Sequence, residues 1–108
     1  MKLITKDIQN KLDKNLTMKE YKRKPYLKLF NPCGAATWLI TEHDNKTGIM
    51  FGLCDLGMGV VEYGYVDMQE VKALRLPFGL SIERDKYFKP KMTLSEYSKH
   101  YTTSLQNV

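Results

Sequence analysis

The sequence predicts a single α+β domain: a four- to five-stranded, mostly antiparallel sheet with an N-terminal helix, a short middle helix and a C-terminal helix. Three observations support this prediction. Residues 35–65 hold three short apolar runs separated by turn-forming residues, the pattern of an antiparallel meander. Helical periodicity follows cap-like residues near both ends of the chain. A length of 108 residues suits one domain.

The N-terminal helix is predicted over residues 6–16, with Thr5 as its cap. Ile8, Leu12 and Leu16 fall on one stripe of such a helix. The stripe is narrow, so we expect the helix to lie on the sheet and to expose its other faces to water.

The first strand is predicted at residues 26–30, after a polar connection that ends at Pro25. Leu27 and Leu29 alternate with their neighbours, and so they are expected to face the core. Asn31 and Pro32 then end the strand.

Three further strands are predicted at residues 37–42, 49–55 and 60–66. The second of them is apolar on both faces, which indicates a strand covered on both sides. Gly52 and Gly64 lie inside strands, where glycine usually marks a bulge or a close approach of another backbone.

The rest of the chain predicts two helices and one more short strand. Asp67 and Glu70, and later Thr93 and Glu96, have the spacing of a capping box at a helix start. The predicted elements are a helix at 68–74, an edge strand at 80–84, a helix at 94–102 with Leu94, Tyr97 and Tyr101 on one face, and a frayed tail at 103–108.

Several spaced blocks resemble the bacterial domain-of-unknown-function family numbered 2958. The blocks are GAATWLITEHD, FGLCDLGMG, EYGY and IERD, and the likeness covers nearly the whole chain. The resemblance implies a small intracellular protein of plasmids, phages and integrated elements, encoded beside anti-restriction genes. It implies no catalytic residue. The chain departs from the family pattern at Val61 and Tyr63, where proline and leucine are expected.

Composition limits where the protein can work. No apolar run approaches the roughly 20 residues of a membrane span, and no signal peptide is recognisable at the start. Two cysteines, Cys33 and Cys54, are too few for a secreted disulfide scaffold. We therefore expect a cytoplasmic protein with free thiols.

The net charge of +5 is unevenly distributed. Residues 1–31 carry nine Lys and Arg against three Asp and Glu, residues 32–70 one against six, and residues 71–108 seven against three. An acidic centre between basic ends predicts either a surface with two oppositely charged regions or segments that neutralise one another in space.

Acidic and nucleophilic side chains give weak catalytic signals. Glu42, Asp55 and Glu62 lie on neighbouring strands and could converge on a hard cation, but no recognised ligand spacing is present. The favoured interpretation is structural, with Asp55 capping a turn. Cys54 is expected in the core and His43 at the surface. No catalytic residue, metal ligand or cofactor is assigned.

Two stretches interleave cations with aromatic rings, as in surfaces that neutralise phosphates and stack on bases. The alternative is a solvated surface whose rings seal the edge of the core. The predicted partner- or nucleic-acid-binding residues are Tyr21, Lys22, Arg23, Lys24, Tyr26, Lys28, Arg84, Lys86, Lys89 and Lys91.

The predicted function is a non-enzymatic interaction protein of a mobile genetic element, a monomer or homodimer. Its expected partner is a host defence complex such as a restriction or CRISPR effector. A nucleic-acid-binding accessory protein is the alternative, and a metal-dependent hydrolase is the least favoured.

Overall fold

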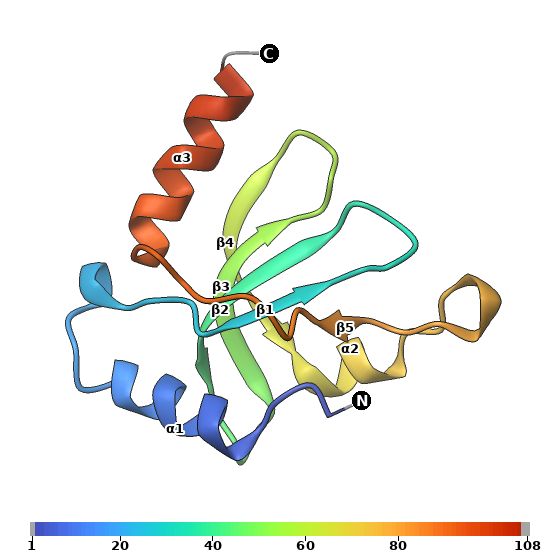
Figure 1. Cartoon of the computed structure of the whole chain (residues 1–108), viewed down its shortest axis with the longest axis horizontal. Coiled ribbons are helices and arrows are strands. Elements are labelled where there is room, and N and C mark those ends of the chain that lie inside the picture. Colours follow the sequence, from blue (N-terminus) through green and yellow to red (C-terminus); the bar gives the residue numbers. More distant parts are fainter. Residues whose placement is uncertain (1, 107–108) are drawn as a thin grey trace.

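The chain folds into a five-stranded antiparallel sheet with the strand order β4-β3-β2-β1-β5 (Figure 1). The computed structural model describes residues 2–106, and the side chains of residues 2–101. The strands are β1 (Leu27–Phe30), β2 (Thr37–His43), β3 (Ile49–Asp55), β4 (Val61–Asp67) and β5 (Glu83–Arg84). The helices are α1 (Lys6–Asn15), α2 (Met68–Ala73) and α3 (Leu94–Gln106), with short 3-10 turns at Glu20–Lys22 and Pro77–Gly79.

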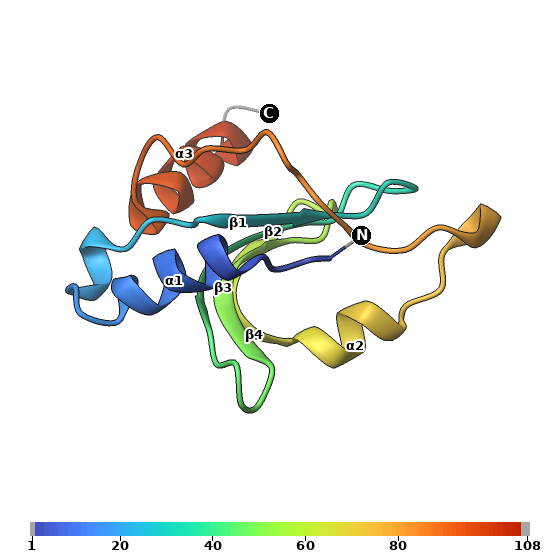
Figure 2. The same cartoon turned by 60° about the horizontal axis from the view of Figure 1, so that its bottom comes forward.

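Helices cover the two faces of the sheet unequally (Figure 2). α1 and α2 lie on one side and α3 lies on the other. Strand alternation divides the core accordingly: Trp38, Ile40 and Met50 join the larger cluster beneath α1 and α2. Leu39 and Leu53 meet the smaller cluster under α3. None of the described helices has both the length and the apolar character needed to cross a membrane.

The predicted helix starts are confirmed. Ile8 N donates to the Thr5 hydroxyl at 3.2 Å, as expected of an N-cap. At α3 the capping box closes in both directions: Glu96 N donates to Thr93 Oγ1 at 3.3 Å, and Thr93 N donates to Glu96 Oε1 at 3.1 Å. The backbone hydrogen bond from Thr93 lowers the pKa of Glu96. At α2, Asp67 caps by accepting from Gln69 N at 2.9 Å.

Several predicted boundaries are wrong. α1 ends at Asn15, and Leu16 is exposed instead of extending the apolar stripe. α3 continues to Gln106, so the predicted tail is helical up to that residue, while residues 107–108 lie outside the described part. The fifth strand is only two residues long, because the chain from Pro77 to Gly79 forms a 3-10 turn that exposes Phe78.

A β-bulge in β2 changes which face Glu42 occupies. Ile40 pairs with Gly52 and Glu42 pairs with Phe51, so Thr41 is the extra residue. The Thr41 carbonyl accepts a hydrogen bond from the buried Asn15 Nδ2 at 2.9 Å. The bulge therefore puts Glu42 on the α3 side of the sheet, which simple alternation did not predict.

The two strand glycines provide a stability test. A Cβ on Gly52 would clash with the Leu39 carbonyl oxygen, whereas a Cβ on Gly64 would meet only Cys54 Sγ, at 3.9 Å. We expect Gly52→Ala to lower the free energy of unfolding by about 2–3 kcal/mol, as overpacking does. Gly64→Ala should leave it unchanged or raise it by about 0.5 kcal/mol. Urea unfolding of both variants measures these free energies. Equal losses in the two variants would contradict the close contact between residue 52 and the Leu39 carbonyl.

Candidate interaction surface

Pairing of β1 with β5 brings the two predicted basic-aromatic stretches to one edge of the sheet. Leu29 pairs with Arg84, and the ammonium of Lys28 lies 5.5 Å from the centroid of the Phe88 ring. Nearby, the backbone N–H of Leu94 donates to the Arg23 carbonyl at 2.9 Å. Segments far apart in the sequence therefore form one continuous surface.

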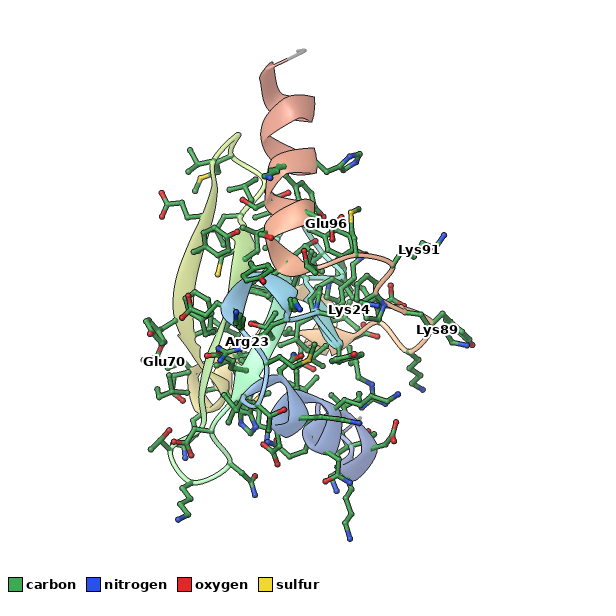
Figure 3. The ribbon with its side chains drawn as sticks, turned by 90° about the vertical axis from the view of Figure 1, so that its left-hand side faces the viewer. Arg23, Lys24, Glu70, Lys89, Lys91 and Glu96 are labelled. Carbon is green, nitrogen blue, oxygen red and sulfur yellow. The ribbon has the colours of Figure 1, made fainter. Side chains whose placement is uncertain are left out.

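We call this surface the basic edge and define it by its exposed residues, Tyr21, Lys22, Lys24, Lys86, Tyr87, Lys89 and Lys91. Within the described part of the chain, none of its five lysines forms an ion pair. Lys89 and Lys91 project from one border of the molecule, and Glu70 from the opposite border, where β4 runs (Figure 3). Glu70 of the acidic centre and these two lysines therefore lie on different sides of the molecule.

A groove of about 620 Å³ runs along β1 and β5 beside these lysines. Lys28, Arg84, Lys86 and Tyr87, from both predicted stretches, line it. Glu83 and Asp85 also line it, so the groove carries both signs of charge. Among the residues that the structure describes, Lys86 is the lining lysine without an ion pair, and the other four lysines of the basic edge are not part of the lining.

Four predicted binding residues are held by contacts within the fold. The Arg23 side chain is mostly buried, where Nε donates to the Asn15 carbonyl at 2.9 Å and Nη1 pairs with the Glu42 carboxylate. Lys28 lies 3.7 Å from the Asp85 carboxylate. Arg84 donates to the Lys2 carbonyl, and Tyr26 packs against the larger core cluster. Sequence reasoning had placed these four with the exposed lysines.

Glu42, Asp55 and Glu62, which could have converged on a hard cation, lie apart on the sheet. Glu42 pairs with Phe51 at one end of β3, whereas Asp55 pairs with Val61 at the other. Glu62 pairs with Cys54, which points to the opposite face from Asp55. Asp55 instead accepts from Gly57 N at 2.9 Å, the predicted turn cap. In the part of the chain that the structure describes, no group of three or more potential ligands can hold a metal ion.

Comparison with known families matches residues 3–105 to the family described as "Protein of unknown function (DUF2958)". The chain belongs to this family. Searches of the curated proteins and of the solved structures return no match. The match confirms the predicted resemblance to this family, and DUF2958 brings no residue roles to this chain.

Cys54 and His43 lie toward opposite ends of their paired strands in this DUF2958 chain, so they form no thiol–imidazole pair. His43 pairs with Met50, whereas Cys54 pairs with Trp38 toward the far end of the same strands. His43 was expected at the surface, but it is half-buried, with Nδ1 2.6 Å from the oxygen of the Gln9 amide. Burial lowers the pKa of His43. Burial, and then Glu62, raises the pKa of the Cys54 thiol, which disfavours the reactive thiolate.

A second basic hollow has no signal in the sequence. A groove of about 890 Å³ lies between α1, α2 and the loop joining β2 to β3. Four lysines from three segments line it: Lys2 and Lys6 at the N-terminus, Lys46 in the loop and Lys72 of α2. No spacing in the sequence relates the three segments, so only the fold brings them together.

The Arg23–Glu42 pair should contribute to stability rather than to binding. We expect Arg23→Ala to lower the free energy of unfolding by about 2–4 kcal/mol, because it leaves a largely buried carboxylate without its partner. Lys11→Ala breaks the exposed pair with Asp7 and should cost less than about 1 kcal/mol. Chemical denaturation compares the two variants. If both variants lost less than about 1 kcal/mol of unfolding free energy, the Arg23 side chain would be free to bind a partner.

His43 should couple stability to pH. Its pKa in the folded protein lies below the ordinary value of 6.5, so the unfolded chain binds more protons as the pH falls. The stabilisation is therefore present above pH 6.5 and is lost as the pH drops toward the folded-state pKa. His43→Gln should flatten the fall in unfolding free energy between pH 7 and 5. The variant His100→Gln, at an exposed histidine, is the control. If both variants flattened the fall to the same extent, His43 would not be the source of the pH dependence.

Proposed function

We propose that the protein is a non-enzymatic binding protein of a mobile genetic element, and that its basic edge holds an acidic surface of a host defence complex. Restriction and CRISPR effectors are the expected class of partner. The element context rests on the family resemblance. Binding by the basic edge rests on the structure.

The observation that carries this proposal is the convergence of two distant basic stretches on one edge of the sheet. The five exposed lysines form no ion pair with the residues that the structure describes, so they repel one another. This repulsion costs stability unless an anionic surface lies against them. β3 and β4, which carry carboxylates of the acidic centre, lie toward the other edge of the sheet. The electrostatic field of the protein therefore has a direction across the sheet. Such a field accelerates and orients association with an acidic partner.

Nucleic acid is the second candidate, favoured by two exposed rings among the lysines. The Tyr21 side chain is 58% exposed and the Tyr87 side chain 92% exposed. Rings with free faces can stack on unpaired bases while lysines neutralise phosphates. The same residues would then serve a single-stranded ligand.

Affinity capture from host lysate tests the protein partner. The variant Lys86→Glu/Lys89→Glu/Lys91→Glu reverses three charges of the basic edge. The matched control, Lys6→Glu/Lys11→Glu/Lys14→Glu, makes the same change of net charge on α1. We expect one or more acidic proteins to be enriched by the wild type and the control and lost from the edge variant. Identical capture by all three would contradict binding by this edge.

A labelled panel of single-stranded and duplex DNA and RNA tests the second candidate. Binding through the basic edge should weaken steeply between 50 and 200 mM salt, as counterion release requires. Lys22→Ala/Lys24→Ala should reduce affinity about tenfold, whereas Lys11→Ala/Lys14→Ala should not. Arg23 is left intact because it stabilises the fold. Absence of binding at low salt would exclude nucleic acid as the ligand.

A further inference from the structure

The two edges of the sheet are protected very differently. β5 is two residues long, so it offers little backbone for pairing. β4 spans seven residues and pairs only with β3 in the described structure. Its ladder with β3 is unbroken from Ile49–Asp67 to Asp55–Val61, without a bulge, and its sequence has no proline, lysine or arginine. Bulges, prolines and charged residues, lysine above all, normally stop an edge strand from pairing. Of these, β4 has only the two carboxylates Glu62 and Asp67.

Aromatic rings lie exposed along this open strand. Tyr63 and Tyr65 flank Gly64 on the α3 side, and their side chains are 48% and 77% exposed. Both rings pack against the Phe51 ring, whose centroid lies 6.1 Å from that of Tyr63 and 5.1 Å from that of Tyr65. The adjoining hairpin adds Leu56, Met58 and Val60, all exposed. Exposed apolar residues gathered along one edge strand and its hairpin indicate an interaction site.

Gly64 has no evident role within one copy of the chain. Gly52 is required because any Cβ there would strike the Leu39 carbonyl, but a Cβ on Gly64 would make one ordinary contact, with Cys54 Sγ at 3.9 Å. Its backbone is not left-handed. Glycine weakens a strand interior, so an unexplained one points to the close approach of another backbone.

We propose that β4 pairs in antiparallel fashion with β4 of a second copy of this chain, about a two-fold axis at Gly64. In this register Tyr63 lies opposite the partner's Tyr65, and Glu62 opposite the partner's Val66. Val61 lies opposite the partner's Asp67. The two sheets join into one of ten strands.

The strand is self-complementary under this symmetry, which favours a second copy over another protein. Four tyrosines form one cluster on the α3 side, and aromatic cross-strand pairs stabilise sheets. No carboxylate lies opposite another. Glu62 and its symmetry mate are four residue steps apart, about 13 Å, beyond the Debye length of about 8 Å at physiological salt. Physiological salt therefore screens the repulsion between the two Glu62 carboxylates, and the dimer should be stronger there than at low salt. Binding by the basic edge should instead be weaker at physiological salt than at low salt.

Analytical ultracentrifugation of the full chain tests the dimer. We expect the wild type to show concentration-dependent mass up to twice that of one chain. Tyr65→Lys, which puts a charge on the open edge, should raise the dissociation constant at least tenfold. The matched control is Tyr87→Lys, at an even more exposed tyrosine, and it should leave the constant unchanged. A wild type that stays monomeric at several hundred micromolar, or equal behaviour of both variants, would overturn the proposal.

Cross-linking tests the register. In a Cys33→Ala/Cys54→Ala background, Tyr63→Cys and Tyr65→Cys chains are prepared separately and mixed. Residues directly opposite on antiparallel strands have Cα atoms about 4.5–5.5 Å apart, within disulfide range. Under oxidised glutathione we expect disulfide-linked dimers in the mixture and few from either variant alone. Equal yields in all three samples would overturn pairing about Gly64.

Discussion

Arg23 is the point on which the arrangement of four segments depends. Its Nε donates to the Asn15 and Met18 carbonyls at the end of α1, and its Nη1 pairs with Glu42 of β2. Its own carbonyl accepts from Leu94 N at the start of α3. Asn15 reinforces the junction by donating to the Lys24 and Thr41 carbonyls. A mostly buried guanidinium with these partners fixes where the first basic stretch leaves α1 and enters β1.

Strand order then determines how charge is distributed. The acidic residues of segment 32–70 belong to β2, β3, β4, the loop between β2 and β3, and α2. The three strands occupy one half of the sheet. β1 and β5 form the other half and carry the basic stretches beside them. Arg23–Glu42 joins the basic N-terminal segment to the acidic centre, Lys11–Asp7 lies within a basic segment, and Lys28–Asp85 joins the two basic segments. Among the described residues, one ion pair therefore links the acidic centre to a basic end, which agrees with the interpretation of two oppositely charged regions.

Local signals in the sequence predicted most of the elements, because each has a local cause. Thr5, Thr93 and Asp67 cap helices through contacts within three residues, and such contacts can be read from spacing. The bulge at Thr41 could not be predicted, since it depends on Asn15 reaching β2 from α1. The same holds for His43, which is half-buried because Gln9 of α1 lies against it.

The candidate surface was predictable in composition but not in detail. Ten binding residues were selected because cations alternate with rings, and the pairing of β1 with β5 does bring the two stretches together. Alternation does not reveal which cation finds a carboxylate, however. Arg23 and Lys28 have partners from other parts of the fold, and Lys89 and Lys91 have none among the described residues. Exposure of Tyr63 and Tyr65 likewise follows from strand order, which places β4 at an edge.

The open edge and the basic edge lie at opposite sides of the sheet, and this has a consequence for a dimer joined through β4. Its basic edges occupy the two ends of a ten-stranded sheet, nine strand spacings or about 40 Å apart. Neither surface obstructs the other. A partner with one acidic patch gains nothing from this geometry. A partner with a repeated anionic surface, such as a symmetric complex or a nucleic acid, contacts both ends. Once the first contact has formed, the fixed distance between the two basic edges sets the effective concentration at which the second contact forms. Dimerisation through an apolar edge would thus turn a weak, salt-sensitive basic surface into a bivalent one.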